Sequence, residues 1–183
     1  DIQGKALGVP IYELLGGLTR DKVRVYASPM VRDKDPEQLA KRYIDLKKQG
    51  FTAAKIFVNG NDKSLKEGHD EYFSGRIEME REAHRGMTLP EAVAFGRAVE
   101  PYRPMVLEDP VTPDNYDTMA EVASKIGVPI ATGERFTSLR EFEVLMSRHA
   151  AQYVRPDVCA IGGITTAKKV AAIAEAHDVL VIP

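Results

Sequence analysis

Three glutamates recur at an even interval along this 183-residue sequence. Glu108 follows Glu82 by 26 residues, and Glu134 follows Glu108 by the same interval. Glu108 and Glu134 come at the ends of short apolar runs, and a fourth acid, Asp157, comes after another. In barrels of alternating strands and helices, chemistry takes place at the C-terminal ends of the strands. The interval fits one strand and one helix, so we expect the three glutamates on neighbouring strands, pointing to one place.

Three converging carboxylates favour the binding of a divalent cation. Negative charges held close together are unfavourable unless a cation neutralises them. Mg²⁺ takes a few carboxylate oxygens and leaves positions open for a substrate. The sequence therefore predicts a Mg²⁺ site at Glu82, Glu108 and Glu134. A single acid at a strand end can equally be a solvated cap of the following helix, but three at equal spacing favour the metal.

Short β-branched apolar runs alternate with longer segments of helical period, and these elements must position the acids. The pattern predicts parallel strands joined by crossover helices, which is the α/β class, in a single domain over residues 1–183. The expected strands are Val23 to Ser28, Phe51 to Val58, Met105 to Glu108, Pro129 to Thr132, Ala151 to Arg155 and Val179 to Ile182. The expected helix caps are Asp35 before Pro36, Thr88 with Glu91, Thr137 with Arg140, and Thr165 before Ala167.

The stretch from Gly75 to His84 departs from this alternation. A strand is expected before Ala83, yet the stretch contains no apolar β-branched run. Either residues are deleted there or the sequence skips some. The sequence also begins without Met and stops inside an expected strand at Pro183, so we expect further residues beyond both ends.

Composition excludes several classes of function. The 25 Lys and Arg against 27 Asp and Glu give a net charge of −2, which predicts no nucleic-acid partner and no anionic membrane. At 44% hydrophobic and 28% charged residues, the sequence is typical of a globular domain. No apolar run approaches the roughly 20 residues of a membrane span. Cys159 is the single cysteine and is expected to pack as a small apolar residue, in a reducing, cytoplasmic setting.

Four motifs carry a resemblance to a known family. They are the segment from Asp1 to Gly17, Leu107-Glu108-Asp109-Pro110-Val111, Thr132-Gly133-Glu134-Arg135, and Arg155-Pro156-Asp157 followed by Gly162-Gly163-Ile164-Thr165. Together they resemble the mandelate racemase and muconate lactonizing enzyme branch of the enolase superfamily, most of all its galactonate- and mannonate-type sugar-acid dehydratases. The resemblance implies a TIM-like (β/α) barrel that is incomplete here, without the capping domain, one internal strand and the last strand.

The resemblance also implies an activity. It implies a Mg²⁺-dependent dehydratase that removes the proton α to the carboxylate of an aldonate or aldarate, loses a β-hydroxyl and gives a 2-keto-3-deoxy acid. The metal stabilises the negative charge that develops on the substrate, which is the physical reason that such a weakly acidic proton can be removed. Small-molecule carboxylates are therefore the expected partners, and the family favours a homo-oligomer.

Individual roles follow from the same resemblance. Glu82 takes the place of the first metal ligand, usually Asp, although it could belong to a preceding helix and leave the true ligand unseen. His84 is the candidate acid for the departing hydroxyl, with a surface histidine as the alternative. Lys55 is the candidate base, or else pairs with a nearby acid. Asp157 would orient a histidine on the next strand, expected just after Pro183.

Two residues are candidates for binding the substrate. Arg135, beside the third expected ligand, could bind a hydroxyl or carboxylate of the sugar acid or pair with the acidic cluster. Ser28, at the end of the first expected strand, could line the pocket.

Two other functions remain open from the sequence. A racemase or epimerase needs two opposed bases and no leaving group, and Lys55 opposite a histidine would allow it, whereas His84 favours elimination. A non-catalytic scaffold is the alternative from another class, supported by Glu82 at the first ligand position and by the missing strand.

Overall fold

The computed structural model describes residues 2–28, 36–55 and 86–183. The expected first metal ligand Glu82, the candidate acid His84 and the stretch where a strand is missing lie outside these residues. The chain divides into two compact units, Asp1–Lys55 and Ile56–Pro183.

The helices alternate with short strands over the second unit. In the first unit the helices are α1 (Ile2–Leu7), α2 (Ile11–Leu14) and α3 (Pro36–Lys48). In the described part of the second unit they are α6 (Leu89–Val99), the 3₁₀ helix η1 (Glu100–Tyr102), α7 (Tyr116–Lys125), α8 (Leu139–Ser147) and α9 (Ile164–Ala176). The strands are β1 (Leu107–Glu108), β2 (Ile130–Thr132), β3 (Tyr153–Val154) and β4 (Leu180–Val181).

The four strands pair in the order β1-β2-β3-β4, and every pair is parallel. This confirms the α/β class and the positions of four expected strands, each of which is shorter than expected. Backbone hydrogen bonds continue the pairing past the strand ends. The amide of Arg155 donates to the carbonyl of Thr132 (2.9 Å), and that of Ile182 donates to the carbonyl of Val154 (3.0 Å).

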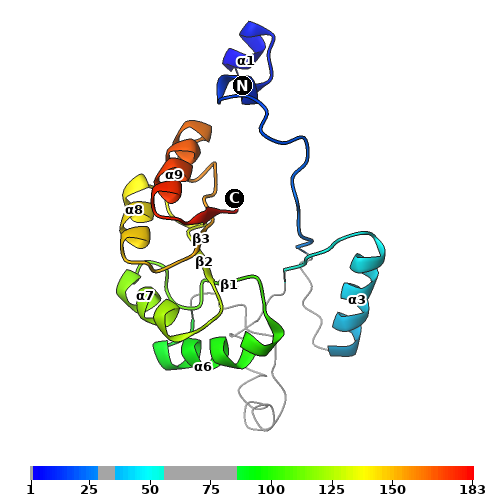
Figure 1. The fold of residues 1–183 in the computed structure, drawn as a ribbon, viewed down its shortest axis with the longest axis vertical. Helices are drawn as coiled ribbons and strands as arrows, with labels where there is room; N and C mark the ends of the chain where they lie inside the picture. The colour runs from blue at the N-terminus through cyan, green and yellow to red at the C-terminus, as the bar shows by residue number, and fades with distance from the viewer. Residues whose placement is uncertain (1, 29–35, 56–85) are drawn as a thin grey trace. The chain divides into compact units, whose positions relative to one another are not determined.

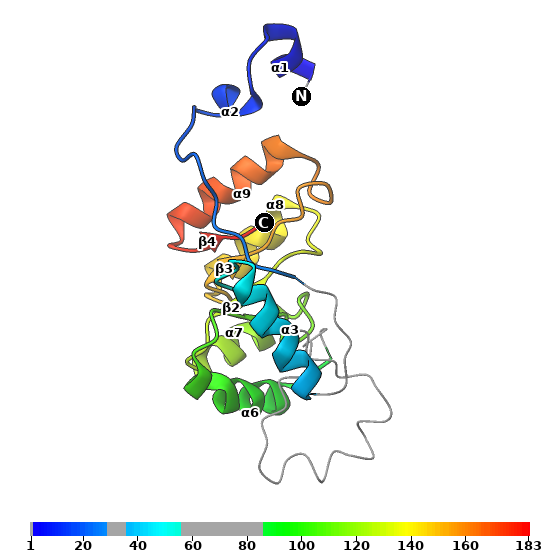
Figure 2. The same cartoon turned by 90° about the vertical axis from the view of Figure 1, so that its right-hand side faces the viewer.

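The helices form one layer beside this sheet. Figure 1 shows α7, α8 and α9 on one side of the strands, and α6 to α9 follow one another in the order of the strands in Figure 1 and Figure 2. This is the arrangement that right-handed crossovers between parallel strands produce.

The hydrophobic core lies between the sheet and these helices. Ile130 and Val154 on the strands are fully buried, as are Met119 on α7 and Phe142 on α8. Each fully buried side chain of this size stabilises the fold by about 1.5–3 kcal/mol.

The register places Glu108, Ala131 and Tyr153 on the opposite face of the sheet. Glu108 pairs with Ala131, and Ala131 pairs with Tyr153. Because successive side chains of a strand point to opposite faces, these three lie on the face away from Ile130 and Val154. The face away from the helices therefore carries Glu108.

The helix caps in the structure confirm one of the caps predicted from the sequence and contradict two others. The amide of Thr88 donates to the carboxylate of Glu91 (2.8 Å), as expected for the start of α6. Helix α3 begins at Pro36, as expected, whereas Asp35 lies outside the described residues. The expected cap Thr137 with Arg140 is wrong, because Ser138 caps α8 and pairs with Glu141.

The expected cap Thr165 is also wrong, because α9 begins at Ile164 after Gly163. Gly163 has φ +103°, a conformation that a residue with a side chain rarely adopts. The amide of Ala167 donates to its carbonyl (3.1 Å), so the backbone of the glycine, without a side-chain cap, starts the helix.

In the first unit, two expected strands form a single parallel bridge between Ala27 and Ala54. The amide of Ala27 donates to Ala53 (3.0 Å), and that of Lys55 donates to Ala27 (2.7 Å). The longer strands Val23 to Ser28 and Phe51 to Val58 are therefore not formed within the described residues. Val23 and Val25 are 71% and 62% exposed, so no burial holds the first run in an extended pair.

Candidate functional site

Glu108 ends β1 at the point where the chain leaves the sheet. Asp109, which is buried, has φ +44°, so the backbone turns sharply after Glu108. The Asp109 amide donates to the carbonyl of Ala131 (3.0 Å), which holds this turn against β2. The side chain of Glu108 is only 16% exposed. A carboxylate that is buried to this extent needs a compensating positive charge.

Arg155 supplies a positive charge to Glu108. Its Nε lies 3.1 Å from Oε1 of Glu108, and its own side chain is 14% exposed. Arg155 follows β3, so the pair spans the end of β2, which lies between the two strands. No role for Arg155 is predicted from the sequence alone. The spacing along the strand could have indicated this role. Arg155 comes two residues after Tyr153 and so lies on the same face of the strand, where the buried charge of Glu108 requires a partner.

Glu134 lies beyond the end of β2, the strand that pairs with β1. Gly133 precedes it with φ +116°, and its position is packed against Phe142. The amide of Phe136 donates to the carbonyl of Gly133 (3.1 Å), which closes a turn around Glu134. Phe136 in turn packs edge-to-face on Phe142, with ring centroids 5.1 Å apart. This packing fixes the loop that carries Glu134.

Arg135, the expected substrate-binding residue next to Glu134, is exposed. An exposed guanidinium can bind an anionic ligand with little desolvation cost, so the exposed position of Arg135 is compatible with binding of a substrate carboxylate.

Asp157 has a local structural role in addition to the one expected. Its Oδ1 accepts hydrogen bonds from the amides of Cys159 (2.7 Å) and Ala160 (3.1 Å). These bonds fix the turn that follows β3 and hold the carboxylate in one orientation. Cys159 is exposed, so the prediction that it packs as a buried residue is wrong. Cys159 lies in the turn that Asp157 caps, and its side chain is at the surface.

Lys55 and Ser28 lie in the first unit. Ser28 is exposed, next to the bridge residue Ala27. The hydroxyl of Tyr43 on α3 donates to the carbonyl of Lys55 (2.9 Å), and burial raises the pKa of that hydroxyl against a lowering effect of Arg42. This bond anchors the backbone of Lys55 to a helix. The two units are not placed relative to one another, so the distance from Lys55 to Glu108 is undefined.

Two of the three expected metal ligands, Glu108 and Glu134, lie within the described residues. Glu108 and Glu134 lie at the ends of two paired parallel strands and offer the carboxylate oxygens that Mg²⁺ prefers. Glu82 lies outside the described residues, and among residues 2–28, 36–55 and 86–183 no three acids, histidines or cysteines come together as a metal site. The donor chemistry of Glu108 and Glu134 fits Mg²⁺.

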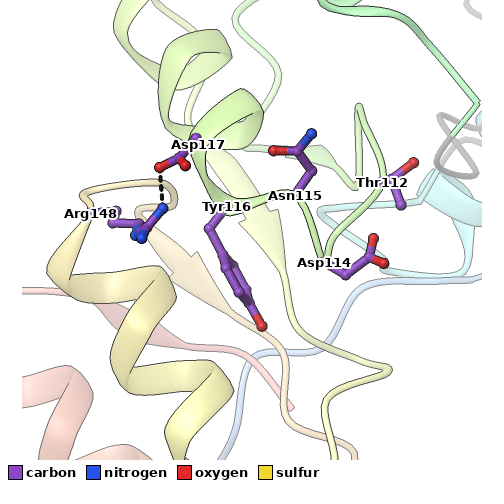
Figure 3. A pocket seen from close by; sticks show the side chains of 6 residues that line it. All are labelled: Thr112, Asp114, Asn115, Tyr116, Asp117 and Arg148. Atoms are coloured by element: carbon purple, nitrogen blue, oxygen red, sulfur yellow. Dashed lines mark hydrogen bonds and ion pairs between the residues drawn. The ribbon is translucent and has the colours of Figure 1, made fainter.

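A separate depression of about 490 Å³ lies at the start of α7. Its lining residues, labelled in Figure 3, are Thr112, Asp114, Asn115, Tyr116, Asp117 and Arg148. Figure 3 shows Arg148 paired with Asp117. Burial raises the pKa of the Tyr116 hydroxyl, with further raising by Glu141 and Asp114 and lowering by Arg148. None of the residues expected in the site lines this depression.

In the part of the chain that the structure describes, no helix has both the length and the apolar composition that a membrane crossing requires.

Comparison with known proteins identifies relatives of this chain. It is 35% identical to a D-galactonate dehydratase of Pectobacterium atrosepticum, over 100% of the chain and 50% of that protein. Its structure is similar to that of a racemase from Streptomyces coelicolor with bound magnesium, with a TM-score of 0.77 and 31% identity, over 94% of this chain and 52% of that one.

A second solved structure is also similar to this chain. It is an L-talarate dehydratase from Polaromonas sp. JS666 complexed with Mg and L-glucarate, with a TM-score of 0.79 and 27% identity. The match covers 98% of this chain and 49% of that one. The chain thus spans about half the length of each relative, as a partial TIM-like barrel. The sequence profile of the family described as "Enolase C-terminal domain-like" matches residues 37–183, and the chain belongs to this family.

Proposed function

We propose that the protein of this chain is a Mg²⁺-dependent dehydratase of a sugar acid, an aldonate or aldarate, and gives a 2-keto-3-deoxy acid. The observation that carries the proposal is the position of Glu108 and Glu134 at the ends of the paired parallel strands β1 and β2. The kinship with D-galactonate dehydratases at 34–35% identity supports the substrate class.

Glu108 and Glu134 would hold Mg²⁺, with Glu82 as the third ligand. When bound, Mg²⁺ supplies positive charge where negative charge develops on the substrate carboxylate. Arg135, exposed beside Glu134, is the candidate to bind a hydroxyl or the carboxylate of the sugar acid.

The protein groups move two protons in this proposal. Lys55, or a histidine after Pro183 that Asp157 orients, removes the proton α to the carboxylate. His84 gives a proton to the β-hydroxyl, which leaves as water, because an imidazole titrates close to neutral pH. The resulting enol tautomerises to the 2-keto acid. We expect the protein to work as a homo-oligomer.

The experiment is an assay of the purified protein with a panel of aldonates and aldarates, D-galactonate among them. The 2-keto product is measured as its semicarbazone, with Mg²⁺ and after removal of the metal by EDTA. We expect product with Mg²⁺, loss of activity in EDTA, and recovery when Mg²⁺ is added back. Glu134→Gln removes one metal-binding charge and should lower kcat/KM by about 10²-fold or more, while Arg140→Gln on the exposed face of α8 leaves it unchanged. No product from any acid with Mg²⁺ present contradicts the proposal.

A racemase is the second candidate, because one of the similar solved structures is a racemase with bound magnesium. The same reactions run in D₂O distinguish the two functions. Exchange of the α-proton for deuterium without loss of water favours racemisation, whereas formation of the 2-keto acid favours dehydration.

A further inference from the structure

We propose that Arg155 is the resident counter-cation of Glu108 and that its charge weakens the binding of Mg²⁺ at this carboxylate. The inference rests on the proposed function, in which Glu108 is a metal ligand. It assigns Arg155 a positioning role that sets metal affinity, without contact with the reacting atoms.

The sheet brings the two charges together. Glu108 ends β1 and Arg155 follows β3, and β2 lies between these strands. Glu108 and Tyr153 share the face of the sheet away from the helices, and Arg155, two residues after Tyr153, lies on that face too. The two side chains thus meet across the end of β2, where Nε and Oε1 are 3.1 Å apart.

The backbone holds Arg155 at this position. Its amide donates to the carbonyl of Thr132 (2.9 Å), which extends the pairing of β2 and β3. Pro156 follows directly, is buried, and has a fixed φ. The guanidinium can therefore leave Glu108 only by rotation of its own side chain.

Burial makes each charge depend on the other. The side chains are 16% and 14% exposed, so neither is well solvated. Removal of one partner of such a pair leaves the other charge buried without compensation, which destabilises the fold. In the protein without metal, Arg155 therefore supplies positive charge to the Glu108 carboxylate at the strand end.

Arginine keeps its charge when a metal arrives, because its guanidinium does not deprotonate at any physiological pH. Mg²⁺ bound to Glu108 then shares this carboxylate with a second cation. Two cations held on one carboxylate repel each other, and the repulsion is strong where water is largely excluded. A neutral residue at position 155 removes the repulsion and also removes the positive charge that Arg155 supplies to the carboxylate. Both effects favour the metal.

The test measures Mg²⁺ binding by titration calorimetry with the purified protein. Arg155→Gln should bind Mg²⁺ about tenfold more tightly than the unsubstituted protein. Arg155→Lys, which keeps the charge, should bind Mg²⁺ with an affinity within about threefold of that of the unsubstituted protein. Arg140→Gln removes an exposed arginine on α8 as the matched control and should not change the affinity.

A second measurement uses the melting temperature of the protein and does not depend on its activity. In EDTA, Arg155→Gln should melt at a lower temperature than the unsubstituted protein. Saturating Mg²⁺ should raise the melting temperature of Arg155→Gln by more than it raises that of the unsubstituted protein. The double variant Glu108→Gln/Arg155→Gln has no buried charge at the pair, so it should recover most of the lost stability in EDTA. If Arg155→Gln does not fold without metal, folding of the double variant supports the ion pair, and its failure to fold contradicts it.

The outcomes separate the two proposals. If the unsubstituted protein binds Mg²⁺ and Arg155→Gln binds it equally or more weakly, this inference alone is wrong. If the unsubstituted protein binds no Mg²⁺, the proposed function is wrong and the inference falls with it.

Discussion

A Cβ atom on Gly133 would lie 2.7 Å from Cε1 of Phe142, a distance that real Cβ atoms essentially never show. Gly133 separates β2 from Glu134, and Phe142 is fully buried on α8. The loop that presents the expected metal ligand is thus packed against the core with no room for a side chain at its first residue.

Gly133→Ala should therefore lower the free energy of unfolding by about 2–5 kcal/mol. The left-handed backbone at φ +116° contributes about 1–2 kcal/mol of this and the overlap with Phe142 about 1–3 kcal/mol. Urea unfolding measures the change. Gly162→Ala is the matched control, because Gly162 also has positive φ (+89°) but its nearest neighbour, Thr166 Oγ1, is 3.8 Å away. An equal loss in both variants would show that the contact with Phe142 has no energetic weight.

Glu141 should make the stability depend on pH in the acid range. Burial alone raises the pKa of its carboxyl, but hydrogen bonds from Ser138 and Thr137 outweigh burial and hold the pKa below 4.5. A carboxyl with a lowered pKa in the folded state stabilises the fold above its unfolded pKa, and this contribution is lost as pH falls through the folded value.

Glu141→Gln should consequently lose about 1 kcal/mol of stability at pH 7 and less at an acid pH below the folded pKa, where the native carboxylate is protonated too. Urea unfolding at the two pH values measures both differences. Ser138→Ala, which removes the hydroxyl that donates to Glu141 (2.8 Å), should reduce the same acid-dependent contribution. A loss in Glu141→Gln that is the same at both pH values would show that the carboxylate charge contributes nothing.

Asp157 is expected to act both as a local cap and in catalysis, and two substitutions separate these roles. Asp157→Asn keeps an oxygen that can accept from the amides of Cys159 and Ala160, so stability should change by less than about 0.5 kcal/mol. Asp157→Ala loses both bonds and should cost about 1 kcal/mol. In the dehydratase assay both should lower kcat by about 10²-fold or more, because neither can orient and stabilise a charged base. Full activity of Asp157→Asn would leave Asp157 with the structural role alone.

The stability of the fold should require glycine at position 96 on α6, because α6 lies close to the end of α7 there. A Cβ atom at this position would lie 2.7 Å from Cδ1 and 2.8 Å from Cγ2 of Ile126. Gly96→Ala should lower stability by about 1–3 kcal/mol through overpacking, partly offset by the better helix propensity of alanine. In the background Ile126→Ala, the same substitution should be neutral or stabilising by up to about 1 kcal/mol. Thermal and urea unfolding of the four proteins measure this reversal, and equal effects in both backgrounds would exclude the contact as the cause.

The sequence predicted the strands of the second unit better than those of the first. The runs ending at Glu108 and Thr132 form paired strands because helices cover one of their faces. The run from Val23 has the same apolar β-branched composition, yet Val23 and Val25 are exposed and only Ala27 makes a bridge. Composition shows that a segment can form a strand, but a covering neighbour decides whether it does.

The helix caps show a similar limit of sequence-based prediction at the level of single residues. Thr137 and Ser138 are adjacent hydroxyl residues before α8, and both backbone amides donate to the carboxylate of Glu141. The start of the helix at Leu139 selects Ser138 as the cap. Gly163 caps α9 through a positive φ, for which a side-chain pattern gives no signal.

By itself, the sequence determined that acids stand at the ends of successive parallel strands, because apolar runs, polar ends and an even interval are properties of the chain read in order. The family match covers residues 37–183, which include three of the four motifs that carry the resemblance. Only the tertiary structure decided that Glu108 meets Arg155. That contact depends on the register of β1, β2 and β3 and on the face to which each side chain points, and both arise only when the strands pair.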